Sequence, residues 1–134
     1  MGAVRGFVGL AGPYDFLPLR STRLQAIFGY PGTSPATQPI SFLTPGRKGP
    51  PSLLQVAGKD PVVDPGNSIR LAEKLRETGT SVEVITYSDL DHMRLVGALA
   101  APLRGRFGPV LEDAARWLRA PAGRPPAAAK PSPA

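Results

Sequence analysis

The chain of 134 residues has no cysteine and only one histidine, His92. The lack of cysteine excludes disulfides and thiolate metal sites, and it leaves the redox compartment open. No stretch approaches the roughly 18 consecutive apolar residues of a membrane-spanning helix. The apolar residues 6–12 are too few and too rich in glycine for the hydrophobic part of a secretory signal. We therefore expect no membrane association, and the expected location is the cytoplasm.

Acidic residues are also scarce. The chain has 10 aspartates and glutamates and 16 lysines and arginines, which gives a net charge of +6 and an isoelectric point near 10.3. Such a balance raises the question of a nucleic-acid or other anionic partner. The basic residues are spread thinly along the chain, without a run, a helical stripe or an alternating aromatic platform. The footprint of a nucleic-acid binder is absent, so we interpret the charge as solvated surface.

Hydrophobic residues make up 42% of the chain and charged residues 19%, which is ordinary for one globular domain with a sizeable core. The prolines gather in the stretch 31–51 and in the tail that follows Leu118. The tail is rich in proline and alanine and has nothing to bury. We therefore predict one domain over residues 1–119 and a disordered tail over residues 120–134.

Three short apolar runs bounded by turn residues predict strands, and three amphipathic segments between and after them predict helices. Strand and helix alternate, and this order is typical of parallel pairing with crossover helices. The expected class is α/β, with a short parallel sheet flanked by helices in three layers. The predicted strands cover residues 5–11, 52–57 and 82–87, and the predicted helices cover residues 19–28, 67–78 and 109–118.

Two residues that can carry chemistry follow neighbouring predicted strands. Asp60 lies just beyond the strand at 52–57, and His92 lies a few residues beyond the strand at 82–87. Reactive groups of parallel sheets gather on loops at the carboxyl ends of strands, and adjacent strands lie only about 4.8 Å apart. A carboxylate on Nδ1 of a histidine keeps the imidazole in one tautomer and stabilises its protonated form. The spacing is therefore compatible with an acid and a general base.

The alternative interpretation gives these residues structural roles, because a lone histidine is most often a surface or core residue and an aspartate after a strand is often a turn residue. Other residues near the pair have simpler explanations than catalysis. We expect Asp64 to cap the following helix, Asp89 and Asp91 to shape the loop of His92, Asp15 to bond local backbone in its turn, and Phe28 and Trp117 to lie in the core.

The chain from about Arg5 to Leu118 resembles the C-terminal half of α/β-hydrolases in the carboxylesterase branch that includes feruloyl-esterase-like and arylformamidase-like enzymes. The resemblance rests on sequence segments: residues 9–16 resemble the strand and turn after the nucleophile helix, and residues 27–29 and 39–42 resemble the segment before the acid strand. The run Gly58-Lys59-Asp60, with Val63, Pro65, Asn67 and Ser68, resembles the acid loop. Asp91-His92 and the following residues 99–104 resemble the histidine loop and the helix after it.

By this resemblance Asp60 is the triad acid and His92 the triad base, the substrate is a small-molecule ester, and no metal or organic cofactor is required. The family's upstream nucleophile elbow has no counterpart, because no serine stands in G-x-S-x-G. The leading hypothesis is a fragment of a serine carboxyl-ester hydrolase that carries the acid and the histidine and is inactive alone. The alternatives are a non-catalytic binding or assembly module, which self-associates or pairs with a complementing N-terminal half, and a basic anion-binding protein.

Overall fold

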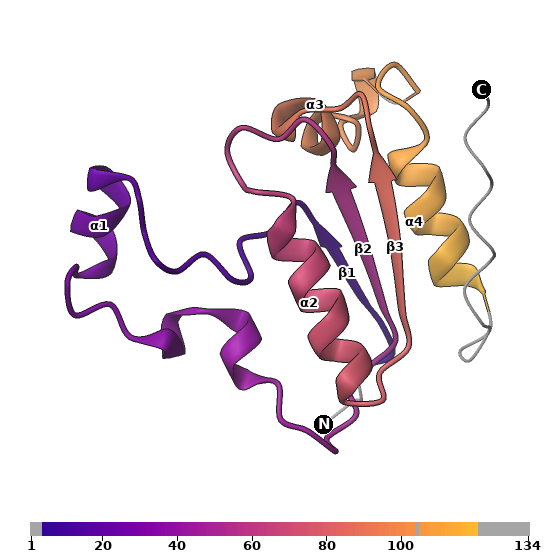
Figure 1. Ribbon diagram of the computed structural model, residues 1–134. Helices are drawn as coiled ribbons and strands as arrows, with labels where there is room; N and C mark the ends of the chain where they lie inside the picture. Colours follow the sequence, from indigo (N-terminus) through magenta and orange to yellow (C-terminus); the bar gives the residue numbers. More distant parts are fainter. Residues whose placement is uncertain (1–3, 104, 121–134) are drawn as a thin grey trace.

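A computed structural model describes residues 4–103 and 105–120, and three parallel strands form the centre of the fold (Figure 1). The strands are β1 (Phe7–Leu10), β2 (Ser52–Ala57) and β3 (Val82–Tyr87), which lie side by side in that order. Helices cover both faces of this sheet. The predicted α/β class, with a short parallel sheet in the middle of three layers, is confirmed.

The central strand is β2, and all six of its residues are buried. It pairs with β1 through Leu54 opposite Gly9, and with β3 through Leu54 opposite Val84. A strand with neighbours on both edges and helices on both faces has no side in contact with water. This environment is the physical reason for the nearly continuous apolar run that predicts the strand.

One face of the sheet is covered by α2 (Gly66–Glu77). Its Leu71 and Leu75 pack against Leu54 of β2, together with Tyr14 from the turn after β1. The spacing of the two leucines places both side chains on one side of the helix. Gly79 follows the helix at a φ of 80°, a left-handed conformation that glycine adopts without steric cost, as the sequence predicts for the end of this helix.

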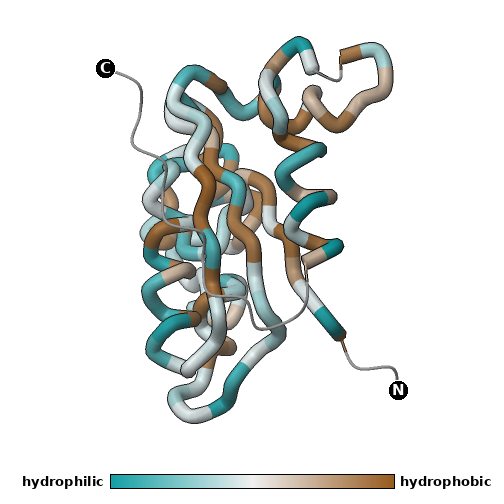
Figure 2. Tube along the Cα trace, turned by 90° about the vertical axis from the view of Figure 1, so that its right-hand side faces the viewer, coloured by the Kyte–Doolittle hydropathy of each residue, from teal (hydrophilic) through white to brown (hydrophobic). Residues whose placement is uncertain are grey.

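The other face is covered by α3 (His92–Gly97) and α4 (Val110–Arg119). Leu95 and Ala98 from the region of α3 and Val110 from α4 pack against Ala57 of β2. Along the tube in Figure 2, hydrophobic residues recur on the strands, whereas hydrophobic and hydrophilic residues alternate around the helices. This alternation is expected of helices that pack one face on a sheet and expose the other.

The histidine segment differs from the expectation drawn from the resemblance. A helix was expected at residues 99–104, whereas α3 begins at His92 itself and only a 3-10 turn, Ala101–Leu103, follows. Six residues are too few to show a helical period in the sequence. The helix begins where it does because the side chain of Asp91 accepts a hydrogen bond from the backbone N–H of Arg94.

The connection from β1 to β2 carries α1 (Thr22–Phe28), which extends away from the sheet (Figure 1). The helix begins three residues later than predicted and has no buried residue. The prediction that Phe28 lies in the core is wrong, because the residue is 37% exposed. Its ring packs on Phe16 of the same connection, with ring centroids 5.2 Å apart. Two 3-10 turns, Pro35–Thr37 and Pro39–Phe42, lead back toward β2.

The tail predicted to be disordered lies, apart from Ala120, outside the described residues. Trp117, the other aromatic residue expected in the core, is partly buried where α4 passes Gly6 at the entry to β1. Within residues 4–103 and 105–120, no helix has the length and apolar character needed to cross a membrane.

Candidate active site

Asp60 and His92 meet where β2 and β3 end. Asp60 lies three residues beyond β2, and His92 is the first residue of α3, five residues beyond β3. The imidazole Nδ1 lies 2.8 Å from Oδ2 of Asp60. The structure thus brings together the two residues that the sequence analysis singled out, although 32 positions separate them.

The carboxylate of Asp60 is held in one orientation. Its side chain is only 1% exposed, and its Oδ1 accepts hydrogen bonds from the backbone N–H groups of Val62 (2.8 Å) and Val63 (2.9 Å). Oδ1 therefore forms the turn that is common for an aspartate after a strand, while Oδ2 faces the imidazole.

The hydrogen bond at Nδ1 determines which nitrogen of His92 is available for chemistry. An ionised carboxylate can only accept, so Nδ1 is assigned the proton and Nε2 carries the lone pair. The side chain is 23% exposed, and within the described residues its one hydrogen bond is the bond to Asp60. An imidazole with a fixed Nδ1–H and a free Nε2 can take a proton from a hydroxyl group placed next to it.

The two acids beside His92 in sequence do not contact the imidazole. Asp91 caps α3, with Oδ1 at 2.9 Å from the backbone nitrogen of Arg94. Asp89 lies on the surface and pairs with Lys59 at 3.4 Å, and the backbone N–H of Lys59 donates to the carbonyl of Leu90. Both acids shape the histidine loop, as the sequence analysis predicts.

Gly58 lets the acid loop approach the histidine loop closely. A Cβ atom at this position would lie 2.8 Å from Cα and 3.1 Å from the carbonyl oxygen of Ser88, which are backbone atoms that cannot rotate away. The backbone N–H of Gly58 donates to the carbonyl of Tyr87 at 2.9 Å. The contact between Asp60 and His92 therefore depends on the absence of a side chain at Gly58.

Replacing Gly58 with alanine is expected to separate the two loops and to lower the free energy of unfolding by about 1–3 kcal/mol, the usual range for overpacking. The NMR signals of His92 should shift as the bond to Asp60 lengthens. Urea unfolding measures the first effect. The control is Gly32→Ala, because a Cβ at Gly32 would meet nothing closer than 3.6 Å. Equal stability of the two variants would contradict the prediction.

A buried polar network joins β2, β3 and α4, and the sequence analysis did not find it. The Tyr87 hydroxyl donates to Oδ2 of Asp113 and accepts from Nε2 of Gln55, both at 2.8 Å. Gln55 is fully buried and also donates to the carbonyl of Val110. These bonds attach α4 to the interior of β2 and to the last residue of β3, the two strands that lead into the loops of Asp60 and His92. One feature of the sequence could have indicated the network: Gln55 is a polar residue in the middle of the buried run of β2, and a buried amide needs hydrogen-bond partners.

The network makes the fold sensitive to alkaline pH. Burial raises the pKa of Tyr87 above its ordinary value of 10.0, and the hydrogen bond to Asp113 raises it further. The folded state therefore disfavours the phenolate, and the stability present below pH 10 is expected to fall as the pH rises above about 10. Burial also raises the pKa of Tyr14, so part of the dependence remains without Tyr87.

Urea unfolding at a series of pH values between 8 and 11 measures this loss. The variant Tyr87→Phe should start from a lower stability and then show a shallower decline than the native chain. Parallel curves for the two proteins would show that Tyr87 has no part in the alkaline transition.

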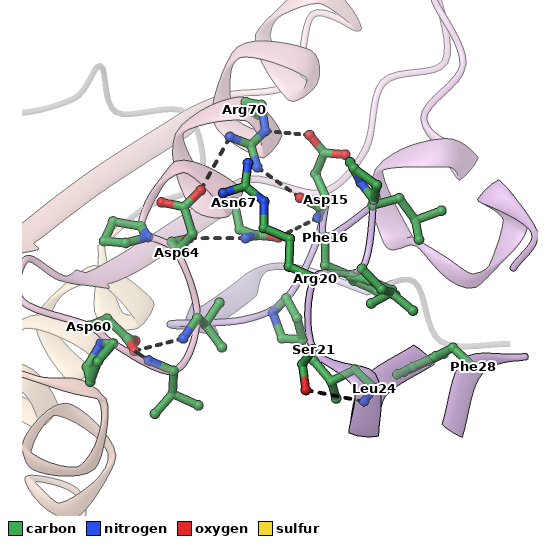
Figure 3. A pocket seen from close by; sticks show the side chains of 18 residues that line it. Asp15, Phe16, Arg20, Ser21, Leu24, Phe28, Asp60, Asp64, Asn67 and Arg70 are labelled. Atoms are coloured by element: carbon green, nitrogen blue, oxygen red, sulfur yellow. Dashed lines mark hydrogen bonds and ion pairs between the residues drawn. The ribbon is translucent and has the colours of Figure 1, made fainter. Parts of the chain in front are cut away.

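A cleft of ≈ 980 Å³ lies beside Asp60, between the acid loop and the segment that leads into α1 (Figure 3). At one end of it, Arg70 of α2 pairs with the carboxylates of Asp15 and Asp64, and the side chain of Asn67 accepts from the backbone N–H of Asp15 at 2.7 Å. The expectation that Asp15 bonds local backbone is wrong, because its partners Asn67 and Arg70 lie on α2, 52 and 55 residues away.

Asp64 lies next to the start of α2, and its Oδ1 accepts from the backbone N–H of Gly66, the first helical residue. The N-cap residue of α2 is Pro65, which follows Asp64 and has no side chain that can form a capping hydrogen bond. Asp64 thus satisfies a free N–H group in the first turn, as expected of it, and also holds Arg70.

The described part of the chain contains no group of three or more histidine, cysteine, aspartate or glutamate residues arranged to hold a metal ion. The chemistry available at the pair is proton transfer.

No family model and no curated protein sequence matches the chain. Solved structures of esterase 2 from Thermogutta terrifontis do match it. The apo form matches over 85% of this chain and 41% of the esterase, with a TM-score of 0.60 and 19% sequence identity. The form phosphonylated by sarin matches over 85% and 43%, with a TM-score of 0.61 and 17% identity. The propionate-bound form matches over 85% and 42%, with a TM-score of 0.58 and 18% identity.

The chain has part of an α/β-hydrolase fold. It spans about two fifths of the length of these esterases. At this level of identity the likeness establishes the fold, and the function has to be argued from the site itself.

Proposed function

We propose that this chain supplies the acid and the base of a serine ester hydrolase, with Asp60 as the acid and His92 as the base. The observation that carries the proposal is the 2.8 Å contact between Nδ1 of His92 and the buried carboxylate of Asp60. The similar structures are of an esterase, which supports ester hydrolysis as the reaction. The carboxylesterase branch and a small-molecule ester substrate are part of the same proposal.

In this mechanism Nε2 of His92 takes the proton of a serine hydroxyl as the oxygen attacks the ester carbonyl. The protonated imidazole is stabilised by Asp60 and then gives its proton to the departing alcohol. A water molecule repeats the sequence to release the acid. The pair supplies only part of this reaction, because attack also requires a nucleophile and donors for the developing oxyanion.

The serine is proposed to come from polypeptide outside the 134 residues, because none of the serines of this chain stands in G-x-S-x-G. The isolated chain should therefore neither hydrolyse p-nitrophenyl acetate in a His92-dependent manner nor react with a fluorophosphonate probe, which labels activated serines. Mass spectrometry locates any label. A labelled serine in this chain, with labelling lost in His92→Ala, would contradict the proposal of an external nucleophile.

A second candidate function is that of an assembly module, and the free edge of β1 favours it. The N–H groups of Phe7 and Ala11 donate to the carbonyls of Pro51 and Gln55 on the β2 side. Because bonding alternates along a parallel strand, the N–H groups of Val8 and Leu10 point away from β2, where the sheet of the described residues has no further strand. An open edge is a site for strand addition.

We therefore expect the chain to self-associate or to bind a complementing polypeptide through this edge. Analytical ultracentrifugation over a range of concentrations measures self-association. A monodisperse monomer that melts cooperatively and takes up no partner strand would remove the support for an assembly role.

A further inference from the structure

The cleft beside Asp60 has apolar walls from two separate parts of the chain. Phe16 and Phe28 contribute from the β1–β2 connection, and Val62 and Val63 contribute from the acid loop (Figure 3). The two phenylalanine rings pack against each other with centroids 5.2 Å apart. A cleft of ≈ 980 Å³ with such walls has the size and lining of a site for a bulky organic molecule.

Arg70 of α2 connects the two walls at the polar end of the cleft (Figure 3). Its Nε donates to the carboxylate of Asp15, and its Nη2 donates to the backbone carbonyl of the same residue at 2.8 Å. Its Nη1 lies 3.6 Å from Oδ2 of Asp64. Asp15 belongs to the β1–β2 connection and Asp64 to the acid loop, so one guanidinium group holds a carboxylate from each wall.

The polar groups of the cleft are mostly bonded to one another. The side chain of Asn67 accepts from the N–H of Asp15 at 2.7 Å and donates to the carbonyl of Asp64 at 3.1 Å. Three carboxylates and two guanidinium groups line the cleft, so this lining has no surplus positive charge. The second guanidinium is that of Arg20, an exposed residue whose charge is screened by water. A charged ligand would therefore lose hydration in the cleft without gaining a free partner.

We propose that Arg70 makes the cleft selective for uncharged apolar groups, because it neutralises two carboxylates that would otherwise face the ligand. Resting on the proposed function, this assigns the substrate class as esters whose aromatic or branched apolar part carries no charge. Such a group gains free energy by burial against the phenylalanines and valines. An anion finds no free positive charge there, and a cation finds carboxylates that are already paired.

Displacement of a neutral fluorescent probe, N-phenyl-1-naphthylamine, tests the proposal. Three competitors share one naphthalene ring: methyl 1-naphthylacetate is an uncharged ester, 1-naphthylacetate is an anion, and 2-(1-naphthyl)ethylammonium is a cation. With the native chain, the ester should displace the probe at a concentration about tenfold below that of either ion, as expected when a charge loses hydration without a partner.

Two variants should change the charge preference in opposite directions. Arg70→Gln leaves Asp15 and Asp64 unpaired, so it should strengthen the binding of the cation about fivefold and weaken that of the anion. Asp64→Asn removes one carboxylate, so it should strengthen the anion relative to the cation and leave the ester unchanged. The asparagine oxygen can still accept from the N–H of Gly66, which preserves the start of α2. A purely structural role of Arg70 would instead change all three competitors by the same factor.

The matched control is Arg23→Gln, which removes an exposed arginine of α1 that does not line the cleft and should leave all three competitors unchanged. Equal affinities of the native chain for the ester and the ions, equal factors for the three competitors in Arg70→Gln, the same shift in Arg23→Gln, or the absence of saturable probe binding would each overturn the proposal. The roles of Asp60 and His92 are tested by the position of the imidazole proton, so either proposal can fail while the other stands.

Discussion

Replacing Asp60 with asparagine is expected to reverse the tautomer of His92. The amide oxygen can keep the two bonds from the backbone of Val62 and Val63, which turns the amide NH₂ group toward Nδ1. Nδ1 must then accept, the proton moves to Nε2, and the imidazole can no longer take a proton from a serine. In an assembled hydrolase this change should lower kcat by about 10⁴-fold, the loss found when the acid of a serine-protease triad is replaced by asparagine.

The tautomer can be measured in the chain itself, because His92 is its only histidine. Long-range ¹H–¹⁵N NMR spectra of the neutral imidazole should show the proton on Nδ1 in the native chain and on Nε2 in Asp60→Asn. The matched control is Asp89→Asn, since Asp89 is an exposed neighbour that pairs with Lys59. The same tautomer in the native chain and in Asp60→Asn would show that Asp60 does not orient the histidine.

Leu54→Ala is expected to lower the free energy of unfolding by about 2–5 kcal/mol, the range measured for leucine truncation in protein cores. Leu54 is fully buried at the centre of β2 and packs against Leu71, Leu75 and Tyr14. Its neighbours belong to a strand, a helix and a turn that are fixed by other contacts, so they cannot collapse into the space that the leucine leaves. Urea unfolding of the native and variant chains measures the loss.

The control for this prediction is Leu118→Ala on α4, where the leucine is 61% exposed. A change of about 0.5 kcal/mol or less is expected there, as for most surface substitutions. A loss below about 1 kcal/mol for Leu54→Ala would mean that the space refills or that the isolated chain lacks the packed core described above.

The elements that the sequence predicts well are those with strong local patterns. The run at β2 and the spacing of the leucines of α2 each reflect a surface that must be buried, so their positions agree with the prediction within one residue. The helix α3 was missed because its six residues are too few to show a helical period. Phe28 was misplaced because an apolar residue on an amphipathic helix can face a core or an open cleft, and the sequence pattern is the same for both.

The candidate site was predicted only in part. The approach of Asp60 to His92 follows from their places after neighbouring parallel strands, which any α/β arrangement of these elements would bring together. The network of Gln55, Tyr87 and Asp113 joins β2, β3 and α4, and no local pattern links these three residues. The pairing of Asp15 with Arg70 is similarly invisible in the sequence, since 55 residues separate them.

The sequence by itself determined the class of the fold and the strand ends at which an acid and a histidine stand, because hydrophobic period, turn residues and capping residues act over a few neighbouring positions. Only the tertiary structure decided that Oδ2 of Asp60 lies 2.8 Å from Nδ1 of His92 and that Arg70 pairs with both Asp15 and Asp64 at the end of the cleft. Contacts of this kind depend on how whole helices and loops pack on the sheet. A shift of one ångström in that packing breaks a hydrogen bond and leaves every local pattern unchanged.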